Sequence, residues 1–360
     1  MLNWLDYQSL LSCLVAKDWS IHQFNNSVVN TVVVTISVVT IGVVNTSVGV
    51  NSPDRIERQY LKVPRVVRFV YSGRIGVVTE YPDIDYLAVG HVTLDLAPSS
   101  TIPGGTVTFA ARAAQALGCR VAVLTSAASD LDLDAIFPGM ATENVPSLTT
   151  TTFQNTYRDN RRQQKIFNVA APIHGRHVPS AWARSPIVHL GPIANEIDSS
   201  MVGLFSNSSV GLTPQGWFRR WDKDGHVSQG NWPDAYKTLP LAAAVVLSRE
   251  DLGDPSELDE YVKRARLLVL TEQASGCTVY CREEVRHFPV PLVAEVNPTG
   301  AGDIFAAAFF IRLHQTHGNP WEAAEFANRV ATASVTQEHI EGKIQAISEI
   351  ARSGGFSFTS

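Results

Sequence analysis

Short apolar runs alternate with helix-like segments through most of the chain from residue 85 onward. The run YLAVG (86–90) is followed, after a loop, by TVTFAARAAQALG (106–118), which has helical spacing and a glycine stop, and then by RVAVLTS (120–126). Similar apolar runs return at 187–191, 242–248 and 267–273. This alternation predicts a doubly wound α/β fold, in which helices flank a mostly parallel sheet.

Residues 149–169 break this pattern. Their sequence, TTTTFQNTYRDNRRQQKIFNV, is polar, prone to β structure and partly alternating, which predicts strands that project from the main sheet. We expect a small β lid built from this segment and from another near residues 95–105. The final third predicts three helices, which begin near Asp303, Pro320 and Gly342. We therefore expect one domain over residues 81–355, with the lid attached to it.

The first 80 residues have a different character. The segment Val28–Val50 carries no charge and is long enough to cross a bilayer as a helix, at about 1.5 Å per residue. It is also rich in β-branched and polar residues, such as Thr35, Thr40 and Asn45, which weaken membrane insertion and favour strand over helix. We expect residues 1–80 to be a poorly ordered, low-complexity hydrophobic extension, with a membrane anchor as the less favoured alternative.

Composition and charge narrow the function classes. Hydrophobic residues make up 45% of the 360 positions and charged residues 18%, which is enough to bury a large core. The formal net charge of -5 gives no basic field to gather nucleic acid, so we expect no nucleic-acid partner. The four cysteines lack paired metal-ligand spacing, which favours free thiols in a reducing cytoplasm. Neither GxxxxGK[ST] nor GxGxxG occurs, so the fingerprints of Walker-type ATPases and dinucleotide enzymes are missing.

The candidate chemistry lies in residues 297–303, NPTGAGD, which we call the anion loop. Its glycines let backbone N–H groups approach a ligand closely, and the apolar helix-like run that follows adds its own unpaired N–H groups and dipole. These features predict an anion pocket. Asp303 at its end is either a helix cap or a base that orients an attacking hydroxyl and accepts its proton during phosphoryl transfer. Spacing alone leaves both interpretations open.

The anion loop and four further motifs resemble the ribokinase-like carbohydrate kinases, also called the PfkB family, from about Asp85 to Ile350. The anion loop stands where that family has a signature close to D-T-x-G-A-G-D. The other motifs are VGHVTLD (89–95), PGGTVTFAARAAQALG (103–118), LTEQASGCTVY (270–280) and EFANRVATASV (325–335). Within the family, GGTVTF, FQNTY with RRQQ, and TPQGW are most similar to the branch that contains inositol kinases.

The resemblance implies a cytoplasmic enzyme that uses ATP and Mg²⁺ to phosphorylate a hydroxyl of a small sugar, polyol or inositol. It also implies a homodimer, since lid strands commonly dimerise such kinases. Asp303 would be the catalytic base, and Gly300, Ala301 and Gly302 the anion hole. The other implied residues are Asp95, Gly104, Gly105 and Asn155 for the substrate, Thr271, Gly276, Thr299 and Asn328 for the nucleotide, and Glu250 or Asp251 for the metal.

Several departures from the family pattern leave alternatives open. Ser248-Arg249-Glu250-Asp251 replaces the Asn-x-x-Glu that usually lies near the metal, and Gln273 replaces a common glycine near the phosphates. Both changes would fit a non-catalytic nucleotide or sugar sensor. Asn297 replaces an acid often associated with a monovalent-cation loop, so potassium activation is not implied. Phe109 replaces an asparagine that contacts substrate in many sugar kinases, and together with Phe153 it raises a nucleoside kinase with an aromatic pocket as a further alternative.

Overall fold

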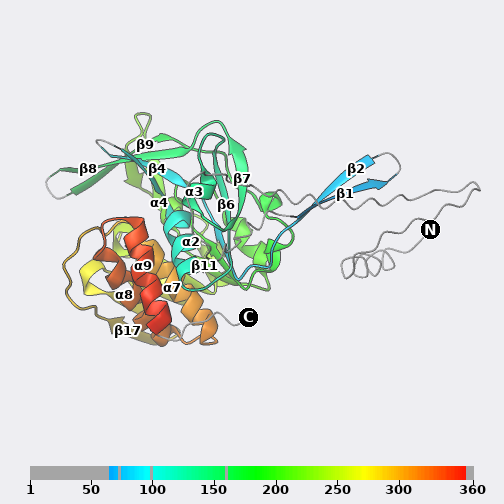
Figure 1. Cartoon of the computed structure of the whole chain (residues 1–360). Helices are drawn as coiled ribbons and strands as arrows, with labels where there is room; N and C mark the ends of the chain where they lie inside the picture. Colours follow the sequence, from blue (N-terminus) through cyan, green and yellow to red (C-terminus); the bar gives the residue numbers. More distant parts are fainter. Residues whose placement is uncertain (1–64, 72–73, 98–99, 159–160, 354–360) are drawn as a thin grey trace, which may run out of the picture. The chain divides into compact units, whose positions relative to one another are not determined.

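The computed structural model describes residues 65–353 except positions 72–73, 98–99 and 159–160 (Figure 1). Strands β1 (Arg65–Tyr71) and β2 (Arg74–Glu80) pair as a two-stranded sheet and belong to a compact unit of their own. The charge-free segment Val28–Val50 lies outside the described residues, as does most of the expected extension. No helix within the described part of the chain is long and apolar enough to cross a membrane.

The second unit is built on a nine-stranded sheet with the order β17-β16-β15-β14-β11-β10-β3-β6-β7. The strands are β3 (Tyr86–Val89), β6 (Val121–Ala128), β7 (Ala141–Ser147), β10 (Ile187–Leu190), β11 (Ser209–Leu212), β14 (Ala244–Ser248), β15 (Leu267–Thr271), β16 (Cys277–Cys281) and β17 (Glu284–Phe288). Neighbours from β7 to β15 are parallel, while β16 and β17 are antiparallel additions. The predicted doubly wound, mostly parallel sheet is therefore confirmed.

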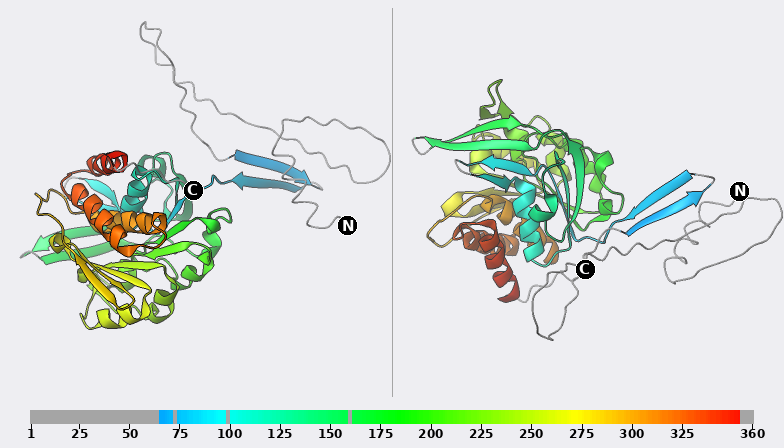
Figure 2. Two further views of the ribbon diagram at one scale, coloured as in Figure 1. Left: turned by 90° about the horizontal axis from the view of Figure 1, so that it is seen from below. Right: turned by 45° about the horizontal axis from the view of Figure 1, so that its top comes forward.

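Apolar layers cover both faces of this sheet, because successive side chains along a strand point to opposite faces. One layer joins alternate strand residues such as Tyr86 and Val123 to α2 (Thr106–Ala116), α7 (Ala301–Gln315), α8 (Pro320–Val335) and α9 (Ile340–Ser353). The other joins the intervening residues, such as Leu87 and Leu124, to α4 (Gln215–Phe218), α5 (Ala235–Thr238) and α6 (Glu257–Arg264). Helices α7, α8 and α9 lie together, coloured orange to red in Figure 2.

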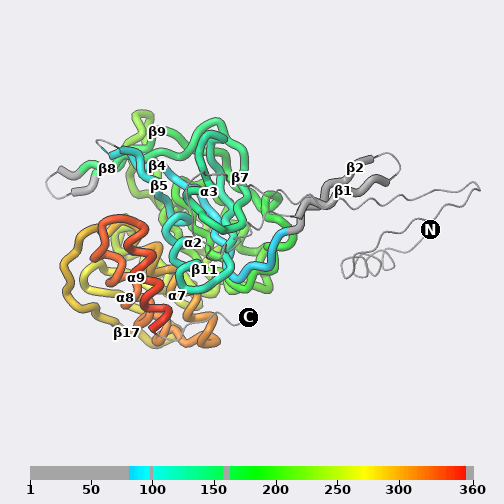
Figure 3. Tube along the Cα trace, in the orientation of Figure 1, coloured from blue at the N-terminus to red at the C-terminus, as the bar shows by residue number. Residues whose placement is uncertain are grey.

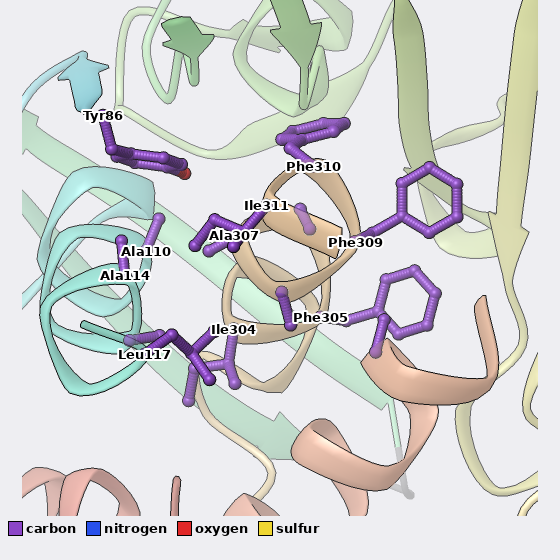
Figure 4. Packing of buried hydrophobic residues seen from close by; sticks show 14 of the residues in the cluster. Tyr86, Ala110, Ala114, Leu117, Ile304, Phe305, Ala307, Phe309, Phe310 and Ile311 are labelled. Carbon is purple, nitrogen blue, oxygen red and sulfur yellow. The ribbon is translucent and has the colours of Figure 1, made fainter. Parts of the chain in front are cut away.

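Helix α7 is apolar around its circumference because it lies between other elements rather than at the surface. Figure 4 shows it beside α2, with Ala110 and Ala114 of α2 close to Ala307 of α7. Small side chains at this contact let the two helices approach closely. On the sheet side, the ring of Phe310 occupies the space above Gly211, where a Cβ atom would lie 2.4 Å from Phe310 Cδ2. This packing fixes α7, and with it the anion loop at its start.

Four further strands form a separate sheet with the order β5-β4-β8-β9 (Figure 3). They are β4 (Thr93–Leu96), β5 (Thr101–Gly104), β8 (Thr151–Arg158) and β9 (Arg161–Asn168), and they come from the two segments expected to form a lid. β4 runs parallel to β8 and pairs Asp95 with Phe153. The remaining elements are the short helix α3 (Leu133–Ile136) and a two-stranded sheet of β12 (Arg219–Trp221) and β13 (Val227–Gln229). Cys119, Cys277 and Cys281 are free thiols, as expected.

Candidate active site

The anion loop ends in a backbone conformation that requires glycine. Gly300 is the N-cap residue of α7 and has a left-handed φ of 79°. A Cβ atom on it would lie 2.3 Å from the ring of Phe109, so both conformation and space exclude a side chain there. A Cβ atom on Gly302, in contrast, would have no neighbour within 4 Å, so the loop faces open space at that point. A helix start of this kind favours a bound anion, although the N–H of Ala301 already donates to Pro298 O at 3.0 Å.

Asp303 lies in the first turn of α7, which begins at Ala301 and thus two residues before the expected start. Since Gly300 occupies the N-cap position, helix capping does not explain Asp303. The pKa of its carboxyl is raised from 3.8 to about 6, chiefly by burial and also by the nearby charges of Asp251 and Asp95. A hydrogen bond with Thr106 and the positive charge of Arg219 act in the opposite direction. The result is a carboxylate poised near neutral pH, as a general base requires.

The expected substrate residues gather around this carboxylate. Gly104 lies against Asp95, where a Cβ atom would be 2.7 Å from Asp95 Oδ2. Gly105, with φ of 87°, is the N-cap residue of α2 and is directly followed by Thr106, the hydrogen-bond partner of Asp303. A Cβ atom on Gly105 would lie 2.5 Å from the carbonyl oxygen of His91. The two glycines therefore let β4, β5 and the start of α2 pack closely beside Asp303.

Asn155 lies in the lid sheet, on β8. It is two residues beyond Phe153 and so shares its face of the strand. Its Oδ1 accepts a hydrogen bond of 2.9 Å from Gln164 on β9. The Asn155 side chain is thus oriented by its neighbouring strand.

Arg219 is a member of this site that the sequence analysis did not select. Its guanidinium lies 5.2 Å from the centre of the Phe153 ring and donates to Ile193 O at 2.9 Å and to Gln215 Oε1 at 2.8 Å. Gln215 in turn donates to Asp251 Oδ1 at 3.1 Å. This network places a fixed positive charge among the carboxyl groups of the site. The one sequence signal was its position two residues after the motif TPQGW (213–217).

The two residues expected to serve a metal have different surroundings. Asp251 is buried, which raises the pKa of its carboxyl, and its Oδ2 accepts the Ser248 N–H at 2.9 Å. Glu250 is exposed and accepts a hydrogen bond from Gln273. Ser248, Glu250, Thr271 and Gln273 line a cavity of about 270 Å³ at the carboxyl ends of β14 and β15, whereas Asp251 does not. Glu250 therefore reaches the open part of the site, while Asp251 supports Gln215 behind it.

A larger cavity of about 470 Å³ lies between the segment after β17 and helix α8. Its lining is mostly apolar and includes Phe288, Val290 and Ile350, and its size is in the range of small-molecule sites. Asn328 contributes to the lining and donates to the carbonyl oxygen of Phe288 at 2.9 Å. A Cβ atom on Gly276 would lie 2.1 Å from the same oxygen, so this glycine allows the two segments to meet.

The predicted nucleotide residues thus fall into three groups. Asn328 and Gly276 shape the large cavity, and Thr271 lines the smaller one. Thr299 belongs to the anion loop, where its N–H donates to Asn297 Oδ1 at 2.9 Å.

Comparisons with known proteins agree with this geometry. Residues 241–345, which include the anion loop, match the family model of the pfkB family carbohydrate kinases. A fructokinase from Klebsiella pneumoniae is 35% identical over 106 residues, which are 27% of this chain and 34% of that protein. An inositol 3-kinase from Zea mays is 34% identical over 155 residues, which are 39% of this chain and 38% of that protein. The chain therefore spans little more than a third of the length of these curated relatives.

The same fold occurs in a pyrophosphate-dependent kinase of the ribokinase family, solved with a pyrophosphate analog and myo-inositol. The TM-score is 0.60 at 20% sequence identity, and the match covers 71% of this chain and 98% of the other. The fold of this chain is therefore ribokinase-like. Residues 241–345 thus match the pfkB family model, and the whole fold is shared with a kinase of the ribokinase family.

Proposed function

We propose that this protein transfers a phosphoryl group from ATP to a hydroxyl of a small sugar, polyol or inositol. The observation that supports this most directly is the place of Asp303. Its carboxyl, with a pKa near 6, lies in the first turn of α7, next to Asp95 and directly after the glycines of the anion loop. A base and an anion-binding surface thus meet at one point, which is what attack by a hydroxyl on a phosphoryl group requires.

In the proposed reaction, Asp95 and Asp303 orient the substrate hydroxyl. Asp303 accepts its proton as the hydroxyl oxygen bonds to the γ-phosphorus, and the bond between that phosphorus and the bridging oxygen of ADP breaks. The N–H group of Gly302 and the dipole of α7 stabilise the negative charge on the transferring group, while the Ala301 N–H donates to Pro298 O at 3.0 Å and holds the loop in shape. At pH 7 Asp303 is mainly ionised, because its pKa is about 6, and so it is ready to accept the proton.

Mg²⁺, when bound, would reduce the negative charge of the donor phosphates. Glu250 lines the smaller cavity, as does Glu272, which is paired with Arg249, while Asp251 lies buried behind it. Both hydrogen bonds to Asp251 leave lone pairs on its oxygens, and Mg²⁺ keeps several of its waters in such sites. The residues present therefore suit a metal held mainly through water rather than by direct protein ligands.

ATP is the favoured donor because of the large cavity beside α8. A donor without a base, such as pyrophosphate, would leave that mostly apolar lining of about 470 Å³ unused. The fold is nevertheless shared with a pyrophosphate-dependent kinase, so pyrophosphate is the second donor to test.

A non-aromatic acceptor is favoured by the packing of two phenylalanines. The nucleoside alternative depends on Phe109 and Phe153 lining an aromatic pocket, yet they are only 7% and 2% exposed. The Phe109 ring packs against Gly300, and the Phe153 ring lies under the Arg219 guanidinium. The carboxylate of Asp95 remains as a partner for hydroxyl groups, which suits a polyol or a sugar.

The test is phosphoryl transfer by the purified full-length chain. ATP or pyrophosphate with Mg²⁺ is offered with a panel of sugars, polyols, inositols and nucleosides, and phosphorylated product is measured by mass spectrometry. We expect product from a polyol or sugar with ATP and none from the Asp303→Asn variant. ATP binding without any product would instead support the sensor. The homodimer and the cytoplasmic location remain predictions, to be measured by light scattering and by cell fractionation.

A further inference from the structure

Lys343 on α9 is a buried lysine that the proposed reaction does not use. Its side chain is 1% exposed, and its Nζ donates hydrogen bonds to the carbonyl oxygens of Asn297 and Ser334, the latter at 3.1 Å. Burial lowers its pKa, while the charges of Glu338 and Glu295 act to raise it. Removing an ammonium group from water is costly unless polar groups replace the water. Here backbone carbonyls take that role.

The carbonyl of Asn297 matters because Asn297 is the first residue of the anion loop. Its Oδ1 accepts the Thr299 N–H at 2.9 Å, within the loop. Its Nδ2 donates to Glu338 O at 2.8 Å, just beyond the end of α8, and its N–H donates to O of Val335, the last residue of α8, at 3.1 Å. The bond from Lys343 engages the remaining polar group of Asn297. All four polar atoms of this residue are therefore held, three of them by the segment 335–343.

The ammonium group also reinforces the junction between the anion loop and the end of α8, where Val296 N–H and Asn297 N–H both donate to Val335 O. Ser334 lies in the last turn of α8 and Asn297 at the start of the loop before α7, and both of their carbonyl oxygens face Lys343 Nζ. Two carbonyl oxygens that converge on one point repel one another, and a positive charge between them turns this repulsion into attraction. Lys343 supplies that charge from a covalently attached side chain, so it is present at full occupancy in every molecule.

We propose that Lys343 is a positioning residue whose ammonium group holds the root of the anion loop as a built-in cation, and that turnover therefore needs no bound monovalent metal ion. This inference rests on the proposed phosphoryl transfer. The loop root then stays in place whether or not potassium is present, and the N–H groups after Gly300 remain aimed at the phosphates. Loss of the ammonium charge opens a carbonyl-lined space that an external cation can enter.

The first arm of the test uses the unaltered full-length chain. Turnover is measured with potassium, sodium or tetramethylammonium salts at equal ionic strength. We expect kcat to agree within about twofold, since a tetramethylammonium ion cannot enter a site of two carbonyls. An increase of fivefold or more in potassium would overturn the inference and leave the proposed function intact.

The second arm uses Lys343→Met, which keeps the length of the side chain but not its charge, and Lys343→Ala, which leaves space. We expect kcat to fall about 10-fold or more in both, with the KM of the acceptor changed less than about twofold, because the loop acts on the transferring group. Potassium or ammonium ions should restore part of the kcat of Lys343→Ala. Arg352→Met, which removes an exposed charge from the same helix, is the matched control and should behave as the unaltered chain.

The outcomes separate this inference from the proposed function. Folded Lys343→Met with unaltered kcat, or Lys343→Ala without cation rescue, contradicts the positioning role. If both variants fail to fold, the cation series on the unaltered chain decides. If the unaltered chain has no turnover at all, the proposed function fails, and pyrophosphate binding by calorimetry replaces kcat as the measurement. The inference is then supported if potassium does not change the pyrophosphate affinity of the unaltered chain and Lys343→Met binds pyrophosphate at least about tenfold more weakly. Equal pyrophosphate affinities of the two proteins refute it.

Discussion

Replacing Asp303 by asparagine should abolish turnover and make the protein more stable at the same time. Burial raises the pKa of this carboxyl from 3.8 to about 6, so the ionised form is disfavoured in the folded protein. A shift of roughly two units corresponds to about 3 kcal/mol as an upper limit. Because the side chain is partly exposed, water reduces this cost, and we expect Asp303→Asn to gain about 1–2 kcal/mol near pH 7.5.

The gain should depend on pH in a definite direction. The folded pKa lies above the unfolded value, so the carboxylate lowers stability most above pH 6 and not at all below the unfolded pKa of 3.8. For a domain of this size the gain corresponds to about 2–8 °C in Tm, measured by differential scanning fluorimetry at several pH values. The control is Asp130→Asn, which removes an exposed carboxylate. Because surface substitutions have small effects on stability, we expect it to shift Tm by less than about 1 °C.

Catalysis should change in the opposite direction from stability. Loss of a general base costs about 10²- to 10⁴-fold in kcat, while donor affinity should remain within a fewfold because Asp303 does not hold the nucleotide base. Unchanged kcat would remove Asp303 from the role of base. An Asp303→Asn variant that is less stable than the unaltered chain at pH 7.5 would show that the carboxylate is not strained by burial, and the argument for its raised pKa would fail.

Three further predictions follow from the same geometry. Gly300→Ala should lower kcat at least about tenfold and reduce Tm, because the new Cβ atom meets the Phe109 ring at 2.3 Å and φ is 79°; unaltered activity would show that the loop tolerates a shift. The acid limb of the pH profile of kcat/KM should lie near pH 6 and move to higher pH in Arg219→Gln, since the Arg219 charge lowers the pKa of Asp303, and an unmoved limb would contradict this coupling. Thr332→Trp should fill the large cavity and raise the KM for ATP more than tenfold without affecting pyrophosphate as a donor; an unchanged KM would place the nucleotide elsewhere.

The fold could be predicted from the sequence because each strand and helix is indicated by residues that are adjacent in the chain. Runs such as 187–191 and 267–273 are continuous apolar strands next to breaker residues, which is how buried parallel strands are read. NPTGAGD likewise carries its chemistry in adjacent residues: the left-handed Gly300 and the carboxylate of Asp303 lie within one turn of each other. Motifs of this kind can be interpreted without knowledge of tertiary contacts.

The rest of the site depends on contacts between distant segments, which have no local signal. Arg219 reaches the site through Gln215 and the Phe153 ring, and nothing in the residues around it distinguishes it from a surface arginine. Lys343 lies on an amphipathic helix, where a lysine is normally exposed, and only the structure shows that its ammonium group meets Asn297. The sequence also could not show that Glu250 is exposed while its neighbour Asp251 is buried, because burial depends on tertiary packing.

In the proposed reaction, Asp303 and the anion loop act together to transfer a phosphoryl group to a hydroxyl. The most direct measurement supplies ATP labelled in its γ-phosphate, with Mg²⁺ and myo-inositol or another polyol of the panel, to the full-length chain and to Asp303→Asn. We expect the unaltered chain to form labelled phosphate ester and the variant to form it at a rate at least about 100-fold lower. Labelled ester formed equally fast by both proteins, or none from the unaltered chain with any acceptor and either donor, would contradict the proposed reaction.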